Sequence, residues 1–249
     1  MNFQTLQPKI SSELSKNGFI VIKDFIPNHL VSKLLKEIRK FNYDKQDKNY
    51  GKLRKDKRFE SEESLSLNIK TLFNEFINPL GKEILGEDNE FSDCQISIIE
   101  KGRKAVKDWH IDGTWIAKEG DTLDEIPFFK LLIGVYLTDL NQPNSGNLTI
   151  SPGGHLLVSN YFDTIKNNKN LDIKTIFNRL FKIQIPSLIS VNVLPGDIII
   201  AHSLAPHSVS DNNNKDRPVI YFRLGGYINK GYPALSNLWH EWPNKISIN

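Results

Sequence analysis

The pattern of apolar and polar residues divides the chain into a helical first part and a strand-rich second part. Apolar residues 19–22 follow Gly18 and predict a short buried strand. Pro27 then begins an amphipathic helix, whose apolar face carries Leu30, Leu34, Leu35 and Ile38. A second helix is predicted from about residue 63 to residue 84. Its mostly inward side chains are Leu67, Ile69, Leu72, Phe73, Phe76 and Ile77.

Residues 50–60, YGKLRKDKRFE, separate the two helices and are basic without apolar periodicity. This composition predicts a surface loop, which could serve as a lid.

From residue 91 onward the pattern changes to short apolar runs separated by Gly, Pro and Asn turns, which is typical of a jelly roll. A helix within residues 161–183 interrupts the series. We therefore predict an α+β, mainly β protein in one domain spanning 1–249: residues 1–90 as helical support on the outer face, 91–230 as the core and 231–249 as a tail. The predicted strands lie within residues 91–100, 128–137, 146–151, 188–194, 196–202 and 217–227.

Composition excludes several classes of protein and narrows the possible metal ligands. No run of about 18 apolar residues occurs, and the first residues are polar, so we expect a cytoplasmic protein without membrane attachment. The net charge of +3 is well short of that of a nucleic-acid-binding face. A single cysteine, Cys94, permits neither an internal disulfide nor a cysteine-rich metal site. A metal would have to be held by imidazole and carboxylate groups, and nothing in the sequence indicates the oligomeric state.

One His–x–Asp pair is a candidate for such a metal site. His110 and Asp112 lie two positions apart in WHIDGTW, so at the end of a strand both side chains point to the same side. The segment 195–212, PGDIIIAHSLAPHSVSDN, offers His202 and His207 as a third ligand. Two histidines and one carboxylate leave three positions open on an octahedral cation, as in iron(II) oxygenases. Zinc on the same ligands is the competing chemistry.

Five ordered segments resemble the phytanoyl-CoA dioxygenase (PhyH-like) family of 2-oxoglutarate oxygenases. They are residues 18–38, WHIDGTW, 132–155 (ending SPGGH), 195–212 and 216–225 (DRPVIYFRLG). The resemblance implies a double-stranded β-helix, or cupin-like jelly roll, with Fe(II) as cofactor, 2-oxoglutarate as cosubstrate and O₂ as oxidant.

The resemblance also assigns residues. It implies that His110, Asp112 and His207 are the catalytic metal ligands, with His207 favoured over His202. It implies that Arg217 binds the distal carboxylate of 2-oxoglutarate, since a guanidinium can contact both carboxylate oxygens.

Two assignments near that arginine stay open. Many family members carry the arginine just after the position of Pro218, so Arg223 is the alternative. Tyr136 occupies a position that lines the 2-oxoglutarate pocket in the family, or is only part of the core. His155 of SPGGH is interpreted as structural.

The reaction implied is hydroxylation of a C–H bond of a small-molecule substrate, with release of succinate and CO₂. Asp112 stands where related halogenases have a small residue, which argues for hydroxylation. Desaturation or cyclisation, a zinc-dependent reaction, and a metal-binding protein without oxidative activity are the alternatives. Basic residues beside the metal motif form a positive rim for an acidic substrate, or are solvated loop residues. They are Lys101, Arg103, Lys104 and Lys107, with Lys52, Arg54, Lys55, Lys57 and Arg58.

Overall fold

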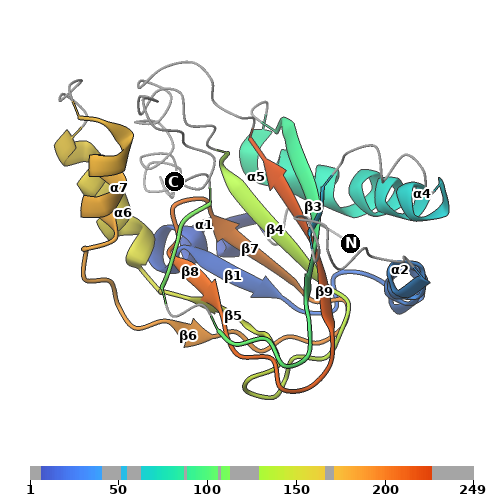
Figure 1. The fold of residues 1–249 in the computed structure, drawn as a ribbon. Coiled ribbons are helices and arrows are strands. Elements are labelled where there is room, and N and C mark those ends of the chain that lie inside the picture. The colour runs from blue at the N-terminus through green and yellow to red at the C-terminus, as the bar shows by residue number, and fades with distance from the viewer. Residues whose placement is uncertain are drawn as a thin grey trace.

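The structure is a computed structural model that describes residues 7–40, 52–54, 63–86, 89–105, 108–112, 129–165 and 171–225. These residues form two antiparallel sheets, one of six strands and one of three (Figure 1). In the order of pairing, the larger sheet contains β1 (Phe19–Ile22), β7 (Ile198–His202), β4 (Leu131–Tyr136), β9 (Arg217–Leu224), β3 (Phe91–Ile99) and β2 (Lys52–Arg54). The smaller sheet contains β6 (Ile189–Ser190), β5 (Leu148–Ile150) and β8 (His207–Val209).

Alternation along the strands gives the larger sheet two buried faces. On β7, Ile198 and Ile200 pack outward with the N-terminal helices, whereas Ile199 and Ala201 pack inward with residues of the smaller sheet. The strand is buried on both sides, which explains why it appears in the sequence as a continuous apolar run. Two sheets packed through their inner faces, with helices outside, confirm the predicted jelly roll.

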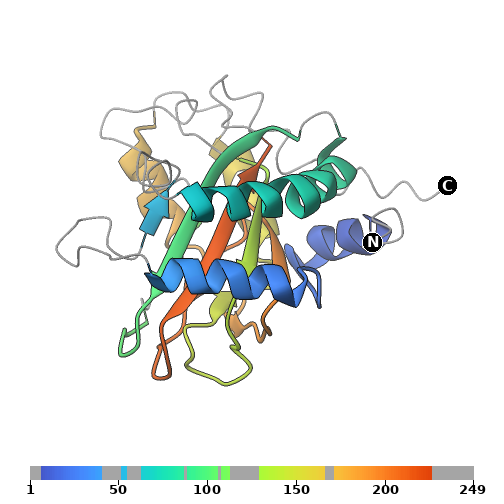
Figure 2. The same cartoon turned by 90° about the vertical axis from the view of Figure 1, so that its right-hand side faces the viewer.

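Four helices lie against the outer face of the larger sheet. Figure 2 shows α2 (Asn28–Lys40) and the run of α4 (Glu63–Leu72) and α5 (Asn78–Leu85) crossing the strands, with α1 (Gln7–Asn17) at the edge. Strand β1 and helix α2 have the predicted positions. Apolar side chains from all four helices join the outer core cluster, so the helices cover the back of the sheet that carries the site.

The second predicted helix is interrupted, and its inward face differs in part from the prediction. A π-helical segment, Phe73–Ile77, separates α4 from α5, because Pro79 in the first turn of α5 has no N–H to donate. Leu67 is 62% exposed, contrary to the prediction, since it lies two residues from the buried Ile69 and so points away from it.

Three further local predictions were wrong. Residues 52–54 form a strand rather than a loop, because β2 pairs with β3 at the edge of the sheet. The remainder of the basic segment is outside the described residues. The predicted single helix is two helices, α6 (Gly154–Ile165), which begins within SPGGH, and α7 (Ile173–Leu180). Strand β8 was not predicted, since it is short and follows a proline.

Along β9, the alternation decides which side chains reach the interior between the sheets. Ile220, Phe222 and Leu224 join the outer cluster. The intervening Arg217, Tyr221 and Arg223 therefore lie on the inner face, and all three line a cavity there. None of the helices in the described part of the chain is long and apolar enough to cross a membrane.

Candidate metal centre

The structure brings His110, Asp112 and His207 together beside the first residue of β8, which is His207. His110 and His207 face each other as an antiparallel bridge, in which each backbone N–H donates to the other's carbonyl at 2.9 Å. Their ring centroids are 4.4 Å apart. Asp112 follows two residues after His110, and the three side chains place one donor atom each within 4.8 Å of one another.

The distances suit a shared cation. The Asp112 Oδ1 atom lies 3.9 Å from His110 Nε2 and 3.6 Å from His207 Nε2. Two ligand atoms that each bind one cation at about 2.1 Å lie about 3.0 Å apart at adjacent octahedral positions and no more than about 4.2 Å apart in any geometry, so the side chains need to approach by less than about 1 Å to bind one cation on adjacent positions.

Hydrogen bonds fix which atoms are available. His207 Nδ1 lies 2.9 Å from the Ala205 carbonyl oxygen. Because a carbonyl only accepts, Nδ1 must carry the proton, and Nε2 presents its lone pair toward Asp112 in the neutral ring. This is the arrangement usual for a metal-binding histidine, whose second nitrogen donates to a carbonyl.

The charges around Asp112 keep it ionised. Burial alone would raise the pKa of the Asp112 carboxyl group, but Arg223, followed by His207 and His110, outweighs burial and holds this pKa well below its usual range. Burial likewise would lower the pKa of His207, but the hydrogen bond and charge of Asp112 raise it above 6.5. An anionic carboxylate beside two imidazoles is a donor set for a divalent cation, which would take the place of the second proton that the charged His207 ring carries on Nε2.

A cavity of ≈ 240 Å³ joins these three residues to Arg217. The Arg217 side chain is fully buried, and none of its three guanidinium nitrogens has a hydrogen-bond partner among the described residues. Burying a guanidinium without a partner is unfavourable by several kcal/mol, on the order of the penalty for any desolvated ion. The arrangement therefore points to an anionic ligand in the cavity.

Tyr136 lies beside Arg217 but is not among the residues that line the cavity. The Arg217 Cζ atom is 5.6 Å from the centre of the Tyr136 ring. Burial raises the pKa of the Tyr136 phenol well above 10, Tyr221 raises it further, and Arg217 opposes both. Tyr136 is thus a neutral group whose ring lies beside the Arg217 guanidinium. Tyr221, which the sequence analysis did not single out, lines the cavity itself.

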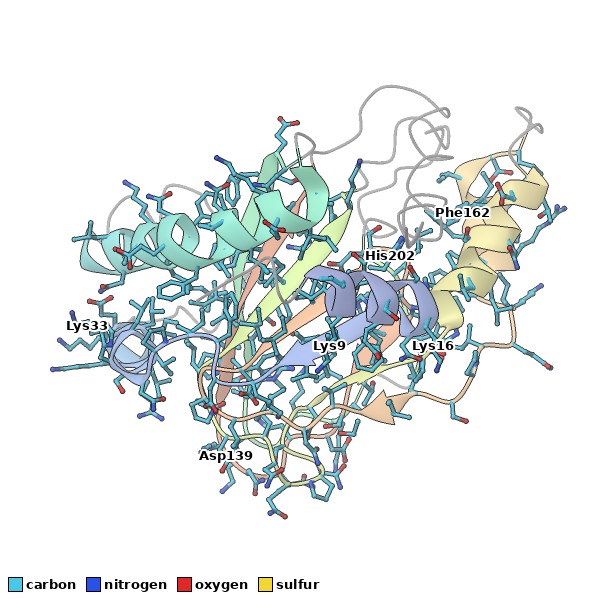
Figure 3. The ribbon with its side chains drawn as sticks, turned by 180° about the vertical axis from the view of Figure 1, so that it is seen from behind. Lys9, Lys16, Lys33, Asp139, Phe162 and His202 are labelled. Carbon is cyan, nitrogen blue, oxygen red and sulfur yellow. The ribbon has the colours of Figure 1, made fainter. Side chains whose placement is uncertain are left out.

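The other two histidines considered lie elsewhere. His202, at the end of β7, accepts a hydrogen bond from the Leu204 N–H on Nδ1 at 3.0 Å. The centroids of the His202 and His155 rings are 5.5 Å apart. The Nε2 atom of His155 lies 3.2 Å from the carbonyl oxygen of Ser15. Figure 3 shows His202 on the side of the sheet near α1 and α6. Neither histidine belongs to the metal-binding group found among the described residues.

The basic residues divide into several groups. Arg103 and Lys104 are exposed and line the cavity, and Lys104 also pairs with Asp211 at 3.2 Å. Lys101 is exposed but does not line the cavity. Lys52 and Arg54 belong to β2. Outside the described residues are Lys55, Lys57, Arg58 and Lys107.

Sequence reasoning missed the partners of Arg223. Its Nε and Nη2 atoms donate to Asp112 Oδ2 at 3.1 and 2.8 Å, and Nη2 also donates to Gln95 Oε1 at 3.2 Å. The even spacing of Arg217 and Arg223 on a strand places both on one face, but it does not tell which arginine is paired.

Comparison with known proteins identifies the family of this chain and structures of similar fold. The family model for phytanoyl-CoA dioxygenase (PhyH) matches residues 14–219. A search of curated proteins finds no match. Among solved structures, the non-heme alpha ketoglutarate dependent carbocyclase SnoK from nogalamycin biosynthesis is 14% identical, with a TM-score of 0.62 over 90% of this chain and 85% of SnoK.

Two further structures are similar. EctD from S. alaskensis, with 2-oxoglutarate and 5-hydroxyectoine, is 14% identical, with a TM-score of 0.61 over 89% of this chain and 76% of EctD. HygX from Streptomyces hygroscopicus, with iron bound, is 13% identical, with a TM-score of 0.59 over 88% of this chain and 86% of HygX. At these identities the likeness concerns the fold. Because the family model covers most of its length, the chain belongs to the phytanoyl-CoA dioxygenase family of iron- and 2-oxoglutarate-dependent oxygenases.

Proposed function

We propose that this protein hydroxylates a C–H bond of a small-molecule substrate, using iron(II) held by His110, Asp112 and His207 and 2-oxoglutarate anchored by Arg217. The observation that carries the proposal is the buried Arg217 guanidinium, which has no partner among the described residues and lines the same cavity as the three ligands. 2-Oxoglutarate is a dicarboxylate that needs a metal at its keto-acid end and a cation at its distal end, and this cavity offers both.

Each residue has a separate task in this proposal. The Nε2 atoms of His110 and His207 and the Oδ1 atom of Asp112 would hold the cation, and a set of two histidines and one carboxylate leaves room for a cosubstrate and oxygen. Arg217 orients the distal carboxylate and keeps the keto-acid end directed at the metal. Tyr136 packs against Arg217 and limits its movement.

Iron(II) supplies the redox chemistry when it is bound. In the overall reaction, substrate, O₂ and 2-oxoglutarate give the hydroxylated substrate, succinate and CO₂. One oxygen atom enters the new hydroxyl group and the other enters succinate.

We also propose that the substrate is anionic. Two exposed cations, Arg103 and Lys104, line the cavity, whereas Asp112 is the sole acidic residue that lines the described part of it. A positive rim attracts an acidic substrate from solution, and salt weakens the attraction.

Cyclisation is the second candidate for the reaction type. It is favoured by the similarity to SnoK, a carbocyclase. Both reactions consume 2-oxoglutarate and O₂, but only hydroxylation adds an oxygen atom to the product. Reaction under ¹⁸O₂ followed by mass spectrometry distinguishes them.

The proposal is tested by measuring substrate-dependent succinate formation. Purified protein is incubated with iron(II), ascorbate, 2-oxoglutarate and a panel of carboxylated and phosphorylated metabolites, with uncharged analogues as controls. We expect succinate above background for an anionic compound, and loss of this activity in the Asp112→Ala variant. Turnover that proceeds without 2-oxoglutarate, or with zinc in place of iron, would contradict the proposal.

A further inference from the structure

Arg223 and Arg217 lie on the same face of β9, yet their surroundings differ. Arg217 has no hydrogen-bond partner among the described residues, whereas Arg223 is bonded to the carboxylate of Asp112. We propose that Arg223 is a positioning residue that makes Asp112 a monodentate ligand and so keeps a coordination position open for the cosubstrates. This inference rests on the iron site proposed above.

The contacts divide the two carboxylate oxygens of Asp112 between two tasks. Arg223 donates to Oδ2 from both Nε, at 3.1 Å, and Nη2, at 2.8 Å. The other oxygen, Oδ1, is the one that approaches the Nε2 atoms of His110 and His207, at 3.9 and 3.6 Å. Because Oδ2 is occupied by two charge-assisted hydrogen bonds, Oδ1 alone is directed at the metal position.

Arg223 is itself held by two residues of β3, Gln95 and Asp93. Its Nη2 atom donates to Gln95 Oε1 at 3.2 Å, and its Nη1 atom lies 3.4 Å from Asp93 Oδ2. Asp93 is the register partner of Arg223 across the β3–β9 pair, so the sheet fixes this contact. The guanidinium also lies over the Phe129 ring, at 5.5 Å. These contacts hold the arginine in place whether or not a metal occupies the site.

The number of coordination positions explains why Asp112 should bind the metal through one oxygen only. Three protein donors leave three positions on an octahedral cation, and a keto acid bound through two atoms plus O₂ requires all three. A carboxylate with two free oxygens can bind a cation through both, which would take one of those positions. Groups that hydrogen-bond to a ligand orient it, and their loss lowers metal affinity by about 10- to 100-fold.

The experiment compares metal binding in Arg223→Met, Arg223→Lys and Arg217→Met. Arg217→Met is the matched control, because it removes a buried arginine from the same strand and face. Iron(II) affinity is measured anaerobically, and the absorption spectrum of the cobalt(II)-substituted protein reports the ligand geometry.

We expect Arg223→Met to weaken iron binding by about 10- to 100-fold and to alter the cobalt(II) spectrum. Arg223→Lys should fall between it and the wild type, since an ammonium keeps the charge but not the planar fork of donors. Arg217→Met should leave both readouts unchanged. Wild-type iron affinity and cobalt(II) spectra in both Arg223 variants would overturn the inference.

Two further variants keep the outcome decisive. Asp112→Ala should abolish iron binding, and if it does not, the proposed iron site itself is wrong. If Asp112→Ala abolishes iron binding but the Arg223 variants bind iron as the wild type does, only the role of Arg223 is wrong. Asp93→Asn loosens Arg223 without removing it, so it should weaken iron binding by a smaller factor than Arg223→Met. Thermal unfolding without metal shows whether Arg223→Met folds. If it does not fold, Asp93→Asn takes its place in the comparison. Wild-type iron affinity in both Asp93→Asn and Arg223→Lys would then overturn the inference.

Discussion

Replacing Arg217 by methionine is the sharpest test of the proposed cosubstrate site. Methionine fills much of the same volume without a charge or a donor. We expect the variant to bind iron as the wild type does, because the Arg217 guanidinium makes no hydrogen bond to the three ligands. It should bind 2-oxoglutarate much more weakly.

The magnitude follows from the surroundings of the guanidinium. Its three nitrogens are buried and have no hydrogen-bond partner among the described residues, so a bound carboxylate could accept two of their N–H groups without displacing an acceptor of these residues. Two charge-assisted hydrogen bonds contribute about 1.5–3 kcal/mol each, or about 3–6 kcal/mol together. This corresponds to a loss of at least about 100-fold in affinity, since each 1.4 kcal/mol is roughly tenfold.

In the absence of ligand, Arg217→Met and Arg223→Met should change the stability of the fold in different directions. Removing a buried charge that lacks a partner relieves an unfavourable desolvation, so Arg217→Met should unfold at the same temperature as the wild type or a higher one. Arg223→Met should unfold at a lower temperature, because it leaves Asp112 and Asp93 without their counter-ion.

The assay uses two keto acids that differ only at the distal end. Both 2-oxoglutarate and pyruvate can bind iron(II) through the keto oxygen and adjacent carboxylate, and the anaerobic titration follows the visible charge-transfer band. Arg217→Met should lower the affinity for 2-oxoglutarate and leave that for pyruvate unchanged, whereas Arg217→Lys should restore part of the difference. An equal loss for both acids, or no loss for either, would refute the reasoning. If Arg223→Met instead shows the selective loss, the two arginines have been assigned in the wrong order.

The remaining predictions concern the histidines and one glycine. His207→Ala should abolish iron binding and turnover, whereas His202→Ala should keep iron affinity and lower only the unfolding temperature; the reverse result would exchange their roles. Burial lowers the pKa of His155 from 6.5 to about 4, against the opposing effect of a backbone hydrogen bond. Above pH 6.5 the ring is neutral in both states, but as the pH falls toward about 4 only the unfolded state gains the proton, so stability should decrease by up to about 3 kcal/mol. Denaturant titrations at several pH values should show a smaller decrease for His155→Gln, and an equal one would contradict the assignment. Gly18→Ala should destabilise the protein by about 1–3 kcal/mol, since φ is +79° and a Cβ atom would lie 2.6 Å from His155 Nδ1; an unchanged urea midpoint would refute this.

Local sequence patterns predicted the elements whose burial follows a simple period. Strand β1 was found because an uninterrupted apolar run follows Gly18, and helix α2 because its apolar residues repeat at helix spacing after Pro27. The interruption at Phe73–Ile77 was missed, because the apolar residues continue through it and only the hydrogen-bond pattern changes. Strand β8 was missed because its pairing with β5 and the His110 bridge are contacts between residues far apart in the chain. The three residues of β8 are too few to show a periodic pattern that would predict such long-range contacts.

The same distinction applies within the site. The i, i+2 spacing of His110 and Asp112 is a local feature, and the sequence alone could propose that pair. Choosing between Arg217 and Arg223 is not a local problem, since both are arginines on the inner face of β9. Their difference is set by what the neighbouring strands and loops carry opposite them: Arg223 meets acceptors from β3 and from the metal motif, and Arg217 meets none among the described residues. A buried guanidinium needs an acceptor, and Arg217 has none among the described residues, so we infer that a ligand supplies it. The pairing of Arg223 therefore supports the assignment of Arg217 as strongly as any property of Arg217 itself.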